Sequence, residues 1–423
     1  MIAAEPAEHP SAETSSENKS NLDVAYVTMQ FPVPSETFAC NDVRVLTERG
    51  VAVTVHALRG RHPDADKLLR EREVEDVVLT HNAPASLLRG LSYGLRHPFR
   101  LSHFLSWIVR TNWRKPEHLV KSFVLALRSL DIFSHLEKDP PDVVFIYWGH
   151  YPSMVGYLVK RHLPGVEVTL SLVAYDLDMG YGGSKVLARQ ADVVRTLSHT
   201  NVVQLSDMYG VPQESIEVVY DGVDMTRFEA VSSLDLQRVK RSKRIVSAGR
   251  LIVDKGMYEV LEVFATVLQR HPDATLVILG DGEERRGLEA KSRALGVAHA
   301  VEFKGHVNHD TVFEEMAKAE VFLFLSYAER LPNVVKEAML CECVCIVSDT
   351  IGIRELIPDD TYGYVVESVE QAGNAVLDVF APGAKETLVA SLTDRASRHI
   401  AENLSVETSV SRYVALWERD SAA

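Results

Sequence analysis

Two carboxylates eight positions apart frame the segment Glu329-Arg-Leu-Pro-Asn-Val-Val-Lys-Glu337, which follows the apolar run 321–325. That run predicts a buried strand, so the segment lies just beyond a strand's C-terminal end, where open parallel sheets bind ligands. Asn333 is placed to cap a helix, and a capped N-terminus offers N–H groups and a positive dipole end to an anion. Glu337 then lies about one turn into the helix. The segment predicts a site for a phosphate beside a polyol; the alternative is a helix with ordinary surface glutamates.

A second anion site is predicted by the strand, loop and helix that span residues 244–271. The stretch 244–247 has strand character, and a helical pattern covers 258–271. The glycine-containing loop between them carries Arg250 and Lys255, and an arginine fork with a lysine point charge suits a diphosphate. The alternative is a helix-start loop whose cations are solvated.

Strand-like apolar runs alternate with helical stretches, which predicts βαβ units and parallel sheets. In the C-terminal half the further runs are 275–282, 301–307, 321–326 and 344–348. In the N-terminal half they are 22–28, 51–58, 142–148 and 166–174. A chain of 423 residues is too long for one ordinary core. The prediction is an α/β protein of two domains.

The order of five motifs in the C-terminal half resembles the donor-binding domain of the retaining GT-B glycosyltransferases of family 4. The motifs are Gly249-Arg250-Leu251, Lys255-Gly256, Gly280-Asp281-Gly282, Gly305-His306-Val307 and Glu329 to Met339. The N-terminal half is similar to members that carry Ser35-Glu-Thr-Phe38 after the first strand. Asp221-Gly-Val-Asp224 resembles the family's segment before the interdomain linker, with Asp in place of Asn. The resemblance covers roughly residues 22–366.

The resemblance implies a GT-B-like fold, in which two doubly wound, Rossmann-like domains face a cleft. Residues 1–20 lack the basic start and hydrophobic middle of an export signal and are expected to form a disordered leader. The other expected parts are an N-terminal acceptor-side domain (21–221), a linker (222–243), a C-terminal nucleotide-sugar-binding domain (244–395) and a helix (396–418) that returns to the first domain.

The activity implied by the resemblance is transfer of a sugar, with retention of configuration, from a UDP- or GDP-sugar to a glycan or lipid-linked acceptor in surface polysaccharide biosynthesis. Such a hexosyltransferase is expected to use no metal and no other cofactor. Two other classes stay open: a non-catalytic nucleotide-sugar-binding subunit, and a GT-B-like epimerase or phosphorylase. The second of these is disfavoured because the sequence shows neither a His-rich site nor a lysine in the context of a pyridoxal cofactor.

Residue roles carry over from the resemblance to the matching positions. Arg250 and Lys255 would hold the donor diphosphate and neutralise the charge that grows on it as the sugar leaves. Glu337 would bind ribose hydroxyls, and Glu329 would contact the transferred sugar. The other donor-binding positions are His306 and Val307 near the nucleobase, and the backbone of Leu331, Pro332, Asn333 and Val334 near the phosphate or sugar.

The family's usual histidine after the strand at 166–174 is replaced by Val173, whose side chain cannot donate a hydrogen bond. Catalysis would then use another group, for which His150 is the candidate, although a lone histidine is more often structural. Asp176 matches the family's aspartate and is expected to face the cleft. Asp176-Leu-Asp178 also matches the Asp-x-Asp metal motif of the other glycosyltransferase fold, but the surrounding pattern is not that fold, so no metal site is expected.

The composition is that of an ordinary soluble globular protein, with 46% hydrophobic and 25% charged residues and a net charge of −14. No stretch reaches the roughly 18 uncharged apolar residues that a membrane span needs. The spacing of the four cysteines suits no zinc site, so reduced, packed thiols in a cytoplasmic protein are expected. These are Cys40, Cys341, Cys343 and Cys345.

Residues 85–130 depart from the acidic character of the chain. They hold eight Arg and Lys and only Glu117 as an acid, a net +7, with Leu, Phe, Tyr and Trp interleaved. A basic, aromatic, amphipathic helical segment predicts peripheral binding to the anionic inner face of a membrane. The acidity of the whole chain argues against nucleic acid as a partner. The alternative is a helical pair that packs its apolar face on the sheet and leaves its cations solvated.

Overall fold

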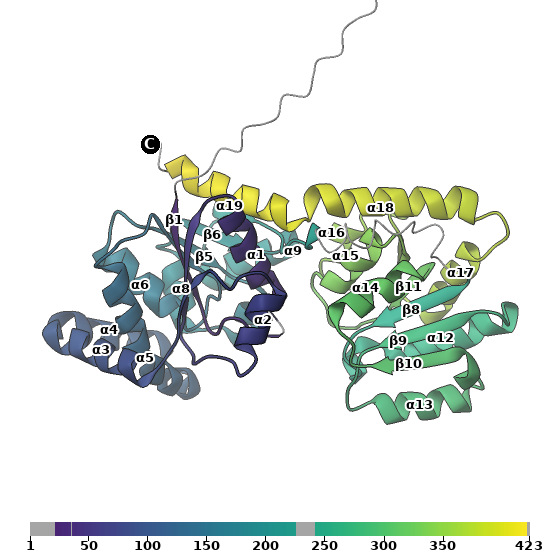
Figure 1. Cartoon of the computed structure of the whole chain (residues 1–423), viewed down its shortest axis with the longest axis horizontal. Helices are drawn as coiled ribbons and strands as arrows, with labels where there is room; N and C mark the ends of the chain where they lie inside the picture. The colour runs from purple at the N-terminus through teal and green to yellow at the C-terminus, as the bar shows by residue number, and fades with distance from the viewer. Residues whose placement is uncertain (1–21, 35, 226–241, 421–423) are drawn as a thin grey trace, which may run out of the picture.

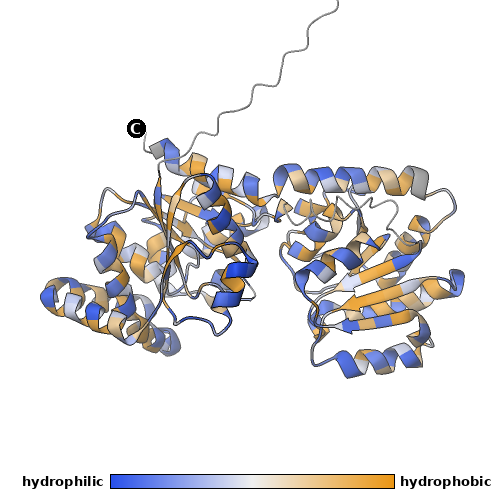
Figure 2. Cartoon of the chain, in the orientation of Figure 1, coloured by the Kyte–Doolittle hydropathy of each residue, from blue (hydrophilic) through white to orange (hydrophobic). Residues whose placement is uncertain are grey.

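The computed structural model describes residues 22–34, 36–225 and 242–420. The predicted leader, 1–20, lies outside the described residues, as does most of the predicted linker, 222–243. Two α/β domains lie side by side, and two C-terminal helices run along both (Figure 1). Figure 2 shows apolar residues concentrated on the strands and on the helix faces turned toward them. The predicted architecture of two doubly wound α/β domains is confirmed.

The first domain is built on a seven-stranded parallel sheet. Its strands are β1 (Asp23–Thr28), β2 (Ala52–Ala57), β3 (Val78–Thr80), β4 (Val143–Ile146), β5 (Glu167–Ser171), β6 (Val193–Thr196) and β7 (Ile216–Val218). The order is β3-β2-β1-β4-β5-β6-β7, so the direction of winding reverses between β1 and β4. The main connecting helices are α1 (Thr37–Glu48), α2 (Ala65–Glu71), α6 (Ser153–His162), α7 (Ala174–Met179), α8 (Gly182–Ala188) and α9 (His199–Tyr209).

The second domain is built on a six-stranded parallel sheet. Its strands are β8 (Arg244–Ala248), β9 (Thr275–Leu279), β10 (Val301–Gly305), β11 (Val321–Phe324), β12 (Val344–Ser348) and β13 (Tyr364–Val366). The connecting helices are α12 (Met257–Arg270), α13 (Arg285–Ala294), α14 (His309–Ala317), α15 (Asn333–Leu340), α16 (Ile353–Leu356) and α17 (Val369–Val379). The order β10-β9-β8-β11-β12-β13 reverses between β8 and β11. In open α/β sheets, ligands bind beyond the carboxyl ends of the strands at that reversal.

The C-terminal helices connect the two domains. Helix α18 (Ala390–Asn403) packs on α15, and α19 (Val406–Asp420) packs on α1. Because Ala396 and Ile400 belong to the core of the second domain, the return to the first domain comes at Ser405, later than the predicted boundary at 396. The chain passes between the domains twice, near Val223 and near Ser405, and the two passages are hydrogen-bonded to each other. Val223 N donates to Leu404 O at 2.8 Å, and Val406 N donates to Val223 O at 3.0 Å.

The basic segment 85–130 forms three helices, α3 (Pro84–Arg96), α4 (Pro98–Asn112) and α5 (Pro116–Leu136). The alternative in the sequence analysis, a pair of helices, therefore has one helix too few. A proline opens each of them, as the fixed φ of proline favours at a first helical position. Helix α3 approaches α5 so closely at Gly90 that a Cβ there would lie 1.9 Å from the Leu127 carbonyl oxygen. Part of the segment is structural, since the Arg128 guanidinium is buried on the Asp131 carboxylate at 2.6 Å.

The predicted state of the cysteines agrees with the structure, since all four are buried thiols that form no disulfide with one another. No helix in the described part of the chain combines the length and the apolar character that a bilayer crossing requires.

Candidate active site

A cavity of about 360 Å³ opens at the carboxyl ends of β8, β9 and β11, at the reversal of strand order in the second sheet. We call it the donor cavity. Seven of the residues predicted to bind the donor line it: Arg250, Lys255, His306, Val307, Glu329, Val334 and Glu337. They come from four separate loops and helix starts, so the sheet topology brings these predicted residues together around one cavity.

Glycines let the loops around the donor cavity converge. Gly256 precedes α12 with φ +62°, and a Cβ there would lie 1.9 Å from the Leu325 carbonyl oxygen. Gly280, after β9, has φ +131°, and its missing Cβ would lie 1.9 Å from the Gly249 carbonyl oxygen. Any larger residue would push these backbones apart, because a Cβ needs well over 3 Å from an oxygen. The glycine spacing of the motifs therefore follows from close backbone packing.

The two predicted diphosphate ligands differ in their surroundings. Lys255 makes an ion pair with Glu329, and both side chains are more than four-fifths buried, at 17% and 19% exposed. Arg250 lines the same cavity with an exposed side chain. The cavity therefore holds one cation already matched to a carboxylate and a second cation that is open to solvent.

Glu337 is oriented by a residue that the sequence analysis missed. His309, the first residue of α14, places its Nε2 atom 2.9 Å from the Glu337 carboxylate. Phe313 packs edge-on against the imidazole, with ring centroids 4.9 Å apart. The sequence signal that could have identified His309 is the preceding Asn308, a residue that favours the cap of a helix. Asn308 caps α14 by accepting a hydrogen bond from Thr311 N at 2.8 Å, and this places His309 at the start of the helix beside the cavity.

The prediction that Asn333 caps α15 is wrong. Asn333 is the first residue of the helix, Pro332 occupies the cap position, and no side chain there caps the helix. The Asn333 side-chain oxygen instead accepts a hydrogen bond from Lys336 Nζ at 3.0 Å, and that ammonium also donates to the Asp221 backbone oxygen at 2.7 Å. Burial lowers the pKa of Lys336 to about 8. Asn333 thus helps to fasten α15 to residues 221–224, the segment by which the chain leaves the first domain and which we call the hinge.

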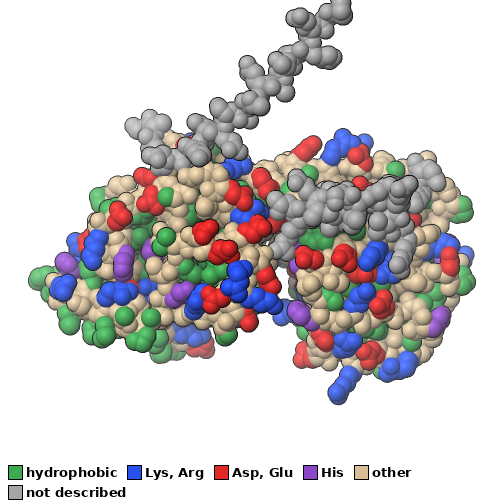
Figure 3. Space-filling model, viewed as in Figure 1, with side chains coloured by type: hydrophobic (Ala, Val, Ile, Leu, Met, Phe, Trp, Pro, Cys, Tyr) green, Lys and Arg blue, Asp and Glu red, His purple; other side chains and the backbone are tan. Residues whose placement is uncertain are grey.

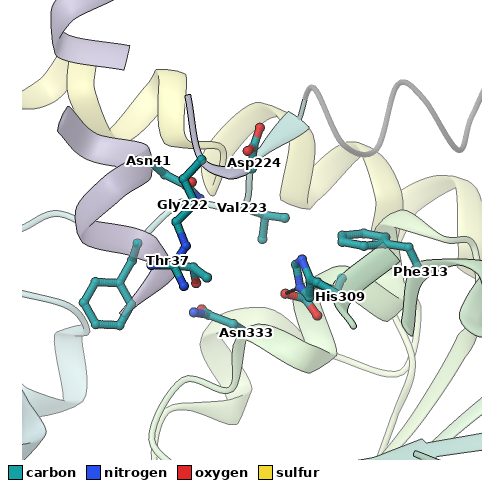
Figure 4. A pocket seen from close by; sticks show the side chains of 11 residues that line it. Thr37, Asn41, Gly222, Val223, Asp224, His309, Phe313 and Asn333 are labelled. Carbon is teal, nitrogen blue, oxygen red and sulfur yellow. Dashed lines mark hydrogen bonds and ion pairs between the residues drawn. The ribbon is translucent and has the colours of Figure 1, made fainter. Parts of the chain in front are cut away.

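Only Val334 of the four backbone positions predicted near the phosphate or sugar lines the donor cavity. Leu331 lines a neighbouring cavity between the domains. Pro332 is buried, and it has no N–H to donate. Asn333 faces a second, hinge-side cavity with Thr37 and His309 (Figure 4). His309 and Glu337 line both the hinge-side cavity and the donor cavity.

His150 and Asp176 do not line the donor cavity. They lie at the carboxyl ends of β4 and β5, where the Asp176 carboxylate accepts from the His150 backbone N–H at 3.0 Å and contacts His150 Nδ1 at 3.0 Å. It also accepts from Val173 N at 3.2 Å. Asp176 is 1% exposed, so the prediction that it faces the cleft is wrong: its oxygens hold together the two loops that bear His150 and Val173.

Asp178, the other carboxylate of the Asp-x-Asp segment, is exposed and pairs with Arg330 of the second domain at 3.2 Å. Within the described residues, no group of three or more His, Cys, Asp and Glu side chains could hold a metal ion.

Comparison with known proteins gives the family. The model of the family described as glycosyl transferases group 1 matches residues 233–381. An uncharacterized glycosyltransferase of Methanocaldococcus jannaschii is 31% identical over 309 residues, 71% of this chain and 78% of that protein. The N-acetylgalactosamine-N,N'-diacetylbacillosaminyl-diphospho-undecaprenol 4-alpha-N-acetylgalactosaminyltransferase of Campylobacter jejuni is 31% identical over 183 residues, 43% of this chain and 48% of that protein.

Among solved structures, Anabaena HepE in complex with UDP superposes with a TM-score of 0.69 at 17% identity, covering 95% of this chain and 100% of that one. At that identity the likeness supports the fold, and the fold is that of GT-B glycosyltransferases. The match over most of the Methanocaldococcus protein, together with the family model and the five motifs in order, shows that this chain belongs to the group 1 glycosyl transferases.

Proposed function

We propose that this chain is a retaining, metal-independent hexosyltransferase that moves a sugar from a UDP- or GDP-sugar to a glycan or lipid-linked acceptor in surface polysaccharide biosynthesis. The observation that carries the proposal is the donor cavity, where two cations and two carboxylates meet at the reversal of strand order. A nucleotide sugar presents the matching groups: a diphosphate between two polyols.

The cations suit the leaving group. As the glycosidic bond breaks, negative charge grows on the diphosphate, and fixed positive groups stabilise it where it develops. Arg250 is open to the cavity, and Lys255 lies beside it on the same loop. With two side-chain cations available, charge neutralisation needs no divalent ion.

The carboxylates suit the two sugars of the donor. Glu337, held by His309, would accept hydrogen bonds from ribose hydroxyls, and Glu329 would accept them from the transferred sugar. Because Glu329 is paired with Lys255, a diphosphate that draws the ammonium toward itself releases the carboxylate for the sugar. A hydrogen bond to a charged group contributes about 1.5–3 kcal/mol.

The names of two similar proteins support the proposed acceptor, stereochemistry and nucleotide. The Campylobacter protein is named for a diphospho-undecaprenol-linked acceptor and an α linkage. An α-linked product from an α-linked donor is retention. HepE was solved with UDP, which supports a uridine nucleotide as the first donor to test.

A lipid-linked acceptor requires the enzyme to reach a membrane, and an exposed apolar surface is available for that. We call it the helix patch, and its exposed apolar residues are Leu88, Leu91, Leu95, Phe99, Trp113, Val120, Phe123 and Val124. Figure 3 shows hydrophobic side chains gathered at the end of the molecule where α3, α4 and α5 lie. Phe99 is 89% exposed.

Charge around the helix patch favours an anionic bilayer as its partner. Arg96, Arg110 and Lys121 are exposed on the same three helices, and Arg114 is exposed in the turn between α4 and α5. Aromatic and apolar groups settle at the headgroup boundary while flanking cations meet the anionic leaflet. We therefore propose that the enzyme acts in the cytoplasm, peripheral at the inner membrane face.

One observation favours a second candidate, a non-catalytic nucleotide-sugar-binding subunit. Val173 stands where the family has histidine; it is 4% exposed, and its side chain has no polar atom. Such a subunit would bind the donor without transferring the sugar.

The experiment that tests the proposal is a thermal-shift screen with UDP, GDP, ADP and their sugars, followed by transfer to membrane-extracted glycolipid. A ligand at 100 times its Kd adds about 2.7 kcal/mol to stability, so a true donor raises the melting temperature clearly. If no nucleotide stabilises the protein, the donor site is refuted. Stabilisation by a sugar nucleotide without transfer to any extracted lipid would establish the non-catalytic reading, and the anomeric form of a product decides retention.

A further inference from the structure

Arg330, the neighbour of Glu329 in the loop between β11 and α15, reaches across to the first domain. Its guanidinium donates to Asn201 Oδ1 and to Gln204 Oε1 at 3.0 Å each, and to Asp178 Oδ1 at 3.2 Å. Asn201 and Gln204 are three positions apart on α9, so their acceptors lie on one face of that helix. The planar fork of arginine suits several acceptors at fixed positions.

The N-terminus of α9 is held from the same side by Glu355 of α16. Its carboxylate accepts from Ser198 Oγ at 2.8 Å, from His199 N at 3.0 Å and from Thr200 N at 3.1 Å. Burial alone would raise the pKa of Glu355, but these hydrogen bonds outweigh it and hold the pKa below its ordinary value. Helix α9 is thus docked on the second domain through a cation and an anion.

Arg330 and Glu355 belong to one surface of the second domain. Gly352, which precedes α16 with φ +85°, lies so close to the loop that a Cβ would come 2.1 Å from the Arg330 carbonyl oxygen. A cavity of about 550 Å³ lies between this surface and α9, and Glu329 lines both that cavity and the donor cavity. The far side of Glu329 is therefore bounded by both domains.

We propose that Arg330 is a positioning residue: its hydrogen bonds to α9 hold the adjacent Glu329 in the geometry that contacts the transferred sugar. The sugar end of the donor site is then complete only when the first domain is docked. The nucleotide end is different, because Arg250, Glu337 and His309 all belong to the second domain. This inference rests on the proposed function and adds to it a dependence of one half of the site on interdomain contact.

The physical reason is the lack of regular structure in the loop. Residues 325–332 form neither helix nor strand, so hydrogen-bonded neighbours must fix Glu329. A catalytic group misplaced by about 1 Å costs on the order of a hundredfold in rate. Substitution of Arg330 by alanine leaves the backbone intact and removes the hydrogen bonds that tie the loop to α9.

The test compares Arg330→Ala, Gln204→Ala and the double variant, with Arg354→Ala as the matched control. Arg354 is a half-exposed arginine of the same domain that pairs with Asp349 of that domain. Turnover is measured as nucleoside diphosphate released, in the presence of membrane-extracted glycolipid, from the sugar nucleotide that stabilises the wild type most. Affinity for the bare nucleoside diphosphate is measured by calorimetry.

We expect Arg330→Ala to lower kcat by at least about tenfold, as loss of hydrogen bonds from a charged donor would. Affinity for bare UDP or GDP should stay within about twofold, and Arg354→Ala should resemble the wild type. Gln204→Ala should have a smaller effect that disappears in the Arg330→Ala background, since both changes break one contact.

Wild-type kcat in Arg330→Ala overturns the inference. So does an equal loss of bare-nucleotide affinity, which would mean general damage to the second domain, and so do fully additive effects of the two substitutions. Failure of the proposed function appears elsewhere, in a wild type that binds or turns over no sugar nucleotide.

Discussion

The ammonium group of Lys255 pairs with the carboxylate of Glu329 inside the donor cavity, although 74 positions separate the two residues in the chain. Each comes from a loop at the reversal of strand order, one after β8 and the other after β11. In this state each charge satisfies the other within a largely buried pair. Under the proposed function, the diphosphate of the donor would bind Lys255 and the hydroxyls of its sugar would bind Glu329, so donor binding would exchange one ion pair for two sets of contacts.

Lys255→Ala should weaken binding of UDP or GDP at least about tenfold, a loss of about 1.4 kcal/mol. The variant removes a cation from the diphosphate and also leaves the Glu329 carboxylate unpaired beside it. Calorimetry on the folded variant measures the change. Lys291→Ala is the control, because that lysine lies on α13 of the same domain and pairs with Glu262 at 2.7 Å. Unchanged affinity in Lys255→Ala would remove the assignment of this cavity to the diphosphate.

Glu329→Ala should cut turnover of the sugar nucleotide by about one to two orders of magnitude, because the lost contact is to the transferred sugar. Affinity for the bare nucleotide should hold or rise, since Lys255 is then free to meet the diphosphate. Steady-state kinetics and calorimetry separate the two quantities. Glu289→Ala, on α13, serves as the control. A parallel loss of turnover and bare-nucleotide affinity would contradict the role given to Glu329.

Glu315→Gln should lower the free energy of unfolding by about 3 kcal/mol at neutral pH, as breaking a buried ion pair does. Burial raises the pKa of Glu315, but hydrogen bonds from Arg244, Lys304 and Lys318 outweigh it and bring the pKa to about 2, below the ordinary 4.5. A depressed folded-state pKa contributes stability that is fully present above 4.5 and is lost as the pH falls toward 2.

Urea unfolding of the wild type and of Glu315→Gln at several pH values measures this stability difference. The difference in unfolding free energy between the two proteins should shrink steadily as the pH falls below 4.5. Glu314→Gln is the control, because the Glu314 side chain is 58% exposed and its carboxylate lies 3.7 Å from the Lys318 ammonium. A gap that does not change with pH would show that charge on Glu315 is not what stabilises the fold.

The helix patch should bind anionic vesicles at low salt and release them as salt rises, because exposed charge attraction is screened over a Debye length of about 8 Å at physiological ionic strength. Sedimentation measures binding, and Trp113, 62% exposed, should report it by fluorescence, whereas Trp107 is buried. Phe99→Ser with Arg96→Gln and Arg110→Gln should abolish sedimentation and leave nucleotide affinity intact.

Val78→Ser is the matched control for the vesicle experiment, since Val78 is 61% exposed on the first domain outside the helix patch. A wild type that ignores anionic vesicles at every salt concentration would leave the patch as a contact for another protein and would favour a soluble acceptor.

Local features of this protein were accessible from the sequence. Strand β9 and strand β11 lie where their apolar runs predicted, because a buried parallel strand needs a continuous apolar segment. The Gly256 and Gly280 turns also follow from local chemistry, since only glycine tolerates those backbone angles with so close a neighbour. Seven of the residues predicted to bind the donor therefore lie in one cavity.

The contacts of individual side chains were not accessible. Asp176 matched a cleft-facing family position, yet it is buried and accepts hydrogen bonds from the loops 149–151 and 172–174. Arg128 of the basic segment is likewise buried, in an ion pair with Asp131. A residue type and its spacing predict an element and an approximate location. They do not predict which of several nearby partners satisfies a charge, because that depends on how separate elements pack.

The sequence by itself determined the elements, their alternation and the motifs that end the strands, because these depend on hydrophobic periodicity and glycine chemistry over a few neighbouring residues. Only the tertiary structure decided which side chains meet. Lys255 pairs with Glu329 across 74 positions, and Arg330 reaches Gln204 across 126. The first contact requires β8 and β11 to be neighbours in the sheet, and the second requires the two domains to dock, and neither condition is encoded in local spacing.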